Sequence, residues 1–163
     1  MHTTPGEDIR ERLAPVLVPI GRTVLGICLG VVLSMIGIGI AWGLFIFFGG
    51  QSSSIWLASL YVGAGLGAGT GCFFAWLRID GDETLTLLLT AAIIAGAGIL
   101  GAWGGFEYGS TQEVECCAMP TKSPIYYTAL GSVVLANAAA IGVAAFRALH
   151  TRQRQTQIQN KVH

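Results

Sequence analysis

Four long apolar stretches, none of which contains a charged side chain, constrain this chain more than any other feature. They cover residues 24–48, 55–77, 85–106 and 125–146. Each is long enough to cross a hydrocarbon core of about 30 Å as an α-helix. Only 11% of the residues are charged, whereas soluble domains carry roughly 25%. The pattern predicts an all-α fold, an integral membrane four-helix bundle in contact with the lipid bilayer.

The segments around the apolar stretches define three parts. Residues 1–23 form an N-terminal cytoplasmic or interfacial segment, in which Pro15 and Pro19 predict an interruption before the first span. Residues 24–148 contain the four spans, with an external loop at 107–124. Residues 149–163 form a basic cytoplasmic tail.

The distribution of Lys and Arg predicts the orientation. Eight of the nine lie on the side of the two termini and the 78–84 connection, and Lys122 alone lies on the other side. By the positive-inside rule, both termini are expected in the cytoplasm, with the chain in the cytoplasmic membrane. The formal net charge is zero, so no overall field would attract nucleic acid.

A short repeat relates the first and third spans. The motif at 37–45 recurs at 98–106 with six identities: Gly37, Ile38, Ala41, Trp42, Gly43 and Phe45 match Gly98, Ile99, Ala102, Trp103, Gly104 and Phe106. The repeat favours two tandem transmembrane hairpins. Chance similarity within a biased composition is the alternative.

Glycines recur at helical spacing in the predicted spans. In the second span they alternate from Gly63 to Gly71, which gives two registers of glycines four residues apart. Because glycine lets helix backbones approach closely in lipid, this spacing predicts packing contacts between helices. A glycine-lined pore or a backbone ligand site is the alternative. The predicted packing glycines are Gly26, Gly30, Gly39, Gly43, Gly63, Gly67, Gly71, Gly101 and Gly105.

The alternate glycines, the four spans and the chain length resemble the duplicated proteolipid of rotary ATPases, a ring of glycine-packed helices. The resemblance implies a shared style of packing. It does not extend to the mechanism, because that family places an ion-carrying carboxylate in mid-membrane. Here no Asp, Glu, Lys, Arg or His lies within the four spans.

The same absence argues against proton-coupled transport, which usually needs an intramembrane ionisable group. No cofactor other than bound lipid is predicted. All three histidines lie near the termini, so a pigment ligated by histidine is not expected. A pigment held without histidine ligation is the open alternative. Asn137 is the one strongly polar side chain deep in a span, and its amide must find a partner. A structural link between helices is favoured over a substrate contact.

The external loop carries Cys116, Cys117 and Met119. These soft ligands could bind Cu(I), but a disulfide is favoured on an oxidising face, and free thiols are the third alternative. No other metal site is predicted, since the acidic cluster at Asp80 and Asp82 is too short for a calcium-binding loop.

No nucleophile and base pair and no phosphate-binding loop is visible, so an enzyme is not expected. The favoured function is a non-catalytic structural or accessory subunit of a larger membrane complex. Its partners would be other membrane subunits or copies of itself, contacted through glycine-rich helix faces. The alternative is a small oligomeric channel or facilitator with a pathway near the second and fourth spans.

Overall fold

The computed structural model describes residues 5–50, 52–76, 84–112 and 123–162. Within these ranges the chain forms four α-helices and no strand. The helices are α1 (Pro5–Phe47), α2 (Ser53–Trp76), α3 (Thr84–Ser110) and α4 (Pro124–Val162). The predicted all-α four-helix architecture is therefore confirmed. Each helix contains a segment long and apolar enough to cross a membrane: Leu17–Phe47, Ser53–Trp76, Thr84–Ser110 and Pro124–His150.

Small side chains fill the interior of the bundle, and large apolar side chains cover its outside. Ala64, Ala68 and Ala102 have no exposed surface, whereas Phe47 is 83% exposed and Ile46 is 71% exposed. An apolar surface of this extent is unusual for a soluble monomer. Together with the four long apolar helices, it indicates a multi-pass membrane protein.

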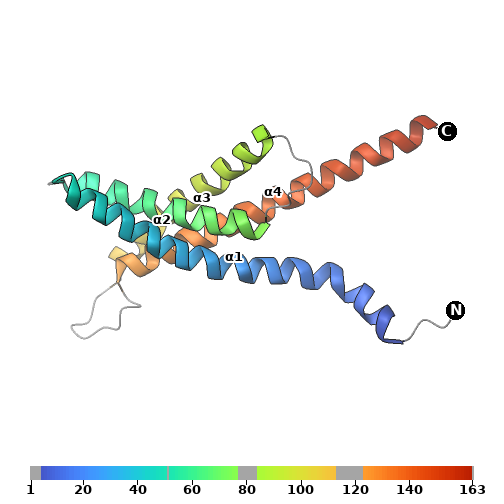
Figure 1. The fold of residues 1–163 in the computed structure, drawn as a ribbon, viewed down its shortest axis with the longest axis horizontal. Helices are drawn as coiled ribbons and strands as arrows, with labels where there is room; N and C mark the ends of the chain where they lie inside the picture. Colours follow the sequence, from blue (N-terminus) through green and yellow to red (C-terminus); the bar gives the residue numbers. More distant parts are fainter. Residues whose placement is uncertain (1–4, 51, 77–83, 113–122, 163) are drawn as a thin grey trace.

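The first helix does not end at its prolines, and the predicted interruption at Pro15 and Pro19 is wrong. Helix α1 is continuous from Pro5 to Phe47. A proline inside a helix removes one backbone hydrogen bond and bends the helix without necessarily ending it, and Figure 1 shows α1 bent in its N-terminal part. The Thr23 hydroxyl donates to the Pro19 carbonyl oxygen at 2.8 Å, a bond from a side chain back to the preceding turn of its own helix, which often accompanies a bend.

Local signals determine where two of the helices end or begin. Gly49 has a φ of 65°, a conformation that glycine adopts without a steric penalty, and its N–H donates to the Ile46 carbonyl oxygen at 3.1 Å. This closes the C-terminal end of α1. At the start of α4, the Ser123 hydroxyl accepts a hydrogen bond from Tyr126 N at 3.3 Å, and Pro124 occupies the first helical position.

The predicted loop at 107–124 is too long at both ends. Helix α3 continues to Ser110 and α4 begins at Pro124. The basic tail is not a separate element either, because α4 continues from its apolar segment to Val162. Hydropathy does not predict either extension, because residues 107–110 and 151–162 are mostly polar.

Helix α2 lies at the centre of the arrangement. Helices α1 and α2 form one closely packed hairpin and α3 and α4 form another, while α2 also packs against α3 and α4. Figure 1 shows the two hairpins crossing, with both chain termini at the same end of the bundle. We call this end the terminal end. Helices α1 and α4 extend beyond α2 and α3 there.

Candidate functional site

The alternate glycines of α2 belong to two different faces of the helix. Residues two apart in an α-helix point about 200° away from each other. Gly63, Gly67 and Gly71 therefore share one face, and Gly65 and Gly69 share the opposite one. The first face packs on α1 and the second packs on α3.

The contact between α1 and α2 leaves no room for side chains. A Cβ added at Gly63 would lie 2.5 Å from the Gly37 carbonyl oxygen. One at Gly67 would lie 2.8 Å from Ser34 Cα, and one at Gly71 would lie 2.6 Å from Gly30 N. Real Cβ atoms do not approach other atoms this closely, so the two backbones pack directly against each other.

The contact between α2 and α3 is equally close. A Cβ added at Gly69 would lie 2.8 Å from Ala95 Cα, and one at Gly65 would clash with the backbone of Ile99. From the other side, a Cβ on Gly98 would lie 2.7 Å from the Gly65 carbonyl oxygen. Gly37 and Gly98, the matching glycines of the sequence repeat, thus both pack on α2 from opposite sides.

The structure separates the predicted packing glycines into two groups. Seven of them lie at contacts between helices: Gly26, Gly30, Gly63, Gly67, Gly71, Gly101 and Gly105. The other two, Gly39 and Gly43, are exposed on α1, and an added Cβ would meet nothing within 4 Å. No contact between the described helices uses them. The prediction also missed Gly37, Gly98 and Gly131, which pack on other helices but have no glycine four residues away in the sequence. It missed Gly109 as well, which packs on α4.

Asn137 joins three helices at one point. Its Oδ1 accepts a hydrogen bond from Trp76 Nε1 of α2 at 3.2 Å, and its Nδ2 donates to the Thr23 carbonyl oxygen of α1 at 3.2 Å. The side chain is 4% exposed. A Cβ added at Gly26 would lie 3.1 Å from Asn137 Oδ1, so glycine at this position makes room for the amide. The sequence indicated that Asn137 needs a partner, and the structure supplies two.

Further buried polar side chains lie along the inward face of α4. Thr128 and Ser132 have no exposed surface, and neither has Ser34 of α1. The hydroxyl oxygens of Ser34 and Ser132 are 3.2 Å apart, and the Ser132 hydroxyl donates to the Ala129 carbonyl oxygen at 2.7 Å. Together with Asn137, these three side chains form a polar seam. Among the described residues, every buried side-chain nitrogen or oxygen has a hydrogen-bond partner.

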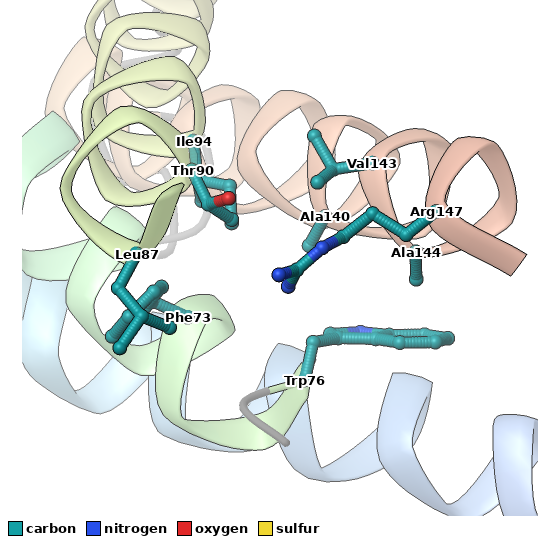
Figure 2. Close-up of a pocket in the computed structure, with 9 residues that line it drawn as sticks. All are labelled: Phe73, Trp76, Leu87, Thr90, Ile94, Ala140, Val143, Ala144 and Arg147. Atoms are coloured by element: carbon teal, nitrogen blue, oxygen red, sulfur yellow. The ribbon is translucent and has the colours of Figure 1, made fainter. Parts of the chain in front are cut away.

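A small pocket lies between α2, α3 and α4, close to the three-helix junction at Asn137. Arg147 carries the one charged side chain among the described lining residues, and we call the pocket the Arg147 pocket. Figure 2 shows the Arg147 side chain extending into the pocket above the Trp76 ring. The pocket has a volume of about 30 Å³ and is partly open. Its lining consists of Phe73, Trp76, Leu87, Thr90, Ile94, Ala140, Val143, Ala144 and Arg147.

Two larger grooves follow the hairpins on their outer surfaces. The groove along α1 and α2 has a volume of about 690 Å³, and Gly37, Gly63 and Gly67 are among its lining residues. The groove along α3 and α4 has a volume of about 360 Å³. Nearly all the side chains that line both grooves are apolar. They therefore suit hydrocarbon, either lipid or another helix, and offer little to a polar substrate.

Cys116, Cys117 and Met119 lie outside the described residues, so the alternatives for the external loop stay predictions. Within the part of the chain that the structure describes, no three His, Cys, Asp or Glu side chains are grouped closely enough to hold a metal ion. Of the cysteines in that part, Cys72 is buried, Cys28 is exposed and neither forms a disulfide.

Comparison with known protein families, with curated proteins and with solved structures gave no match. The fold and the site therefore define the chain by themselves as a multi-pass membrane protein. Its described residues form four helices with apolar segments, a central helix packed through glycine on two faces and a polar junction at Asn137.

Proposed function

We propose that this chain is a non-catalytic structural or accessory subunit of a larger membrane complex. One observation carries the proposal: the glycine contacts between the described helices are already filled by backbone, the buried polar groups are hydrogen-bonded, and Gly39 and Gly43 are a pair at four-residue spacing among the several helical glycines that stay open on the outside. The glycine faces of α2 are both used within the chain. Any surface for a partner helix must therefore lie elsewhere.

The outward face of α1 provides such a surface. Gly39 and Gly43 lie one turn apart with open space above them, and the exposed Met35 continues the same stripe one turn earlier. In lipid, glycines at this spacing allow the backbone of a second helix to approach closely. The apolar groove along α1 and α2 also includes Ile36 and Ile40 of this helix. Both features support docking of a partner helix on α1.

The alternative is a small oligomeric channel with a pathway near α2 and α4, and the polar seam is the feature that such a pathway would have to use. A conducting path needs polar groups that can exchange their partners with water. Here the hydroxyls of Ser34, Thr128 and Ser132 are buried and hydrogen-bonded within the bundle. The seam thus agrees better with a structural link between helices.

Native mass spectrometry after mild extraction tests the proposal. The wild-type chain should leave the membrane together with other polypeptides. Gly39→Leu combined with Gly43→Leu should release it as a folded monomer, because bulky side chains would block close approach at α1. The matched control is Gly142→Leu on α4, another glycine with nothing within 4 Å of an added Cβ, and it should retain the partners. A homo-oligomer without other polypeptides that passes solute in liposomes would instead establish the channel.

A further inference from the structure

Two faces of α1 stay exposed in the described chain, and they differ in shape. One carries Gly39 and Gly43, which lie one turn apart, and an added Cβ at either position meets nothing within 4 Å. The other carries Ile40 and Leu44, which are 59% and 52% exposed and line the groove along α1 and α2. The first face therefore leaves space beside the backbone, and the second carries projecting side chains.

The internal repeat indicates that a helix fits on the second face. In the repeat of the first and third spans, Ile40 and Leu44 match Gly101 and Gly105 of α3. There the equivalent face is covered by α4, since a Cβ added at Gly101 or Gly105 would clash with the α4 backbone. On α1 the same face is open in the described structure. The groove along α1 and α2 thus lies where the other copy of the motif has a neighbouring helix.

The side chains on this face decide which helix can fill the groove. In the α3 and α4 hairpin the two backbones are in contact at this face, whereas Ile40 and Leu44 project from α1. A helix that packs closely on them must lack large side chains at two positions one turn apart. Gly39 and Gly43 have this spacing, because both pairs are four residues apart, and glycine in lipid allows such a close approach.

The two faces also lie at the same depth in the membrane. Copies of one chain insert with the same orientation, because each has the same distribution of Lys and Arg, so residues with the same number lie at the same level. On α2, a Cβ added at Gly63 would lie 2.8 Å from Ala41 Cβ, which places the neighbouring groove residue Val62 at this level as well. The glycine pair of one copy therefore meets Ile40 and Leu44 of another without a shift along the membrane normal.

We propose that the groove along α1 and α2 binds the Gly39 and Gly43 face of α1 from a second copy of this chain. Ile40 and Leu44 then occupy the space beside the two glycines. The inference rests on the proposed function, since it names the partner of the same face of α1. Because the groove and the glycine pair are different surfaces, the copies join head to tail, in a ring or in an open row. In an open row, each end copy keeps one free surface for a different subunit.

Cysteine cross-linking in native membranes tests the proposal. Two versions of the chain are expressed together with different tags, and the native cysteines of both are replaced. One version carries Gly39→Cys and the other carries Val62→Cys, both at exposed positions. A short thiol cross-linker should join the two tags in one band, and either version alone should give no cross-link. A chain that carries both cysteines should give a ladder that extends beyond the dimer.

Two controls separate the proposed contact from random collision. Gly142→Cys replaces another open glycine, but it lies on α4 beyond Asn137, nearer the terminal end and far from the level of Val62. It should not cross-link to Val62→Cys. Gly43→Leu, added to the Gly39→Cys version, fills the space beside the backbone. It should abolish the cross-link and leave the thermal unfolding of the isolated chain unchanged.

Several results would overturn the proposal. A cross-link among copies that carry only Gly39→Cys would show a symmetric contact between glycine faces, and no cross-link between positions 39 and 62 would leave the groove to lipid. Cross-links from position 39 only to other polypeptides would contradict this inference and still support the proposed function. Conversely, linked copies that leave the membrane without any other polypeptide would support this inference and contradict the larger complex that the proposed function requires.

Discussion

Asn137 shows how one polar side chain can organise a membrane bundle. The interior of a bilayer offers no water to replace a missing hydrogen bond, so an amide there must be paired within the protein. Its two partners, Trp76 and Thr23, lie 61 and 114 residues away in the sequence. The need for a partner was predictable from the sequence, because Asn137 is surrounded by apolar residues. The identity of the partners was not, because it depends on how the helices pack.

Asn137→Leu should destabilise the bundle by about 1–3 kcal/mol, because it leaves the Trp76 N–H and the Thr23 carbonyl oxygen without their shared partner. Thermal unfolding in a mild detergent measures the effect. Thr70→Val is the control, since the exposed Thr70 hydroxyl donates only to the Leu66 carbonyl oxygen of its own helix. Equal stability of Asn137→Leu and the wild type would show that the amide does not hold the three helices together.

At the scale of the helix, the alternate glycines of α2 let one helix pack closely against two neighbours. One register of glycines faces α1 and the other faces α3, so a single helix can serve as the centre of both contacts. The two registers were visible in the sequence, but the sequence alone could not say which neighbour each would meet. The sequence also did not predict that α1 continues through Pro15 and Pro19, because a proline can either bend a helix or end it.

Gly67→Leu should destabilise the fold by about 1–3 kcal/mol, the usual range for overpacking, because the new side chain would collide with the backbone of α1 at Leu33 and Ser34. Gly39→Leu makes the same change on α1, where nothing lies within 4 Å of an added Cβ. It should leave the thermal unfolding of the isolated chain unchanged. Similar losses in both variants would contradict the distinction between buried and outward-facing glycines.

At the scale of the whole molecule, two hairpins cross and share α2 as their common element. The number of spans follows from hydropathy alone, since each apolar stretch is bounded by polar residues. The pairing of α1 with α2 and of α3 with α4 agrees with the two tandem hairpins that the repeat at 37–45 and 98–106 favours. The helical extensions at the terminal end lie beyond the apolar segments, so hydropathy does not predict that they continue the spans. The four crossings are the central claim, since the packing of α2, the polar junction and both proposals depend on them.

Cysteine labelling in intact cells tests this claim most directly. Single cysteines are introduced at Ser53, Thr84, Ser110 and Gln155 of a chain whose native cysteines have been replaced. Positions 53 and 110 should react with a membrane-impermeant reagent from outside. Ser53 begins α2 and Ser110 ends α3, and both lie at the end of the bundle opposite the terminal end. Positions 84 and 155 should react only after the membrane has been opened, as the distribution of Lys and Arg predicts. External labelling of position 155, or labelling of position 84 together with position 53, would contradict the four crossings or their orientation.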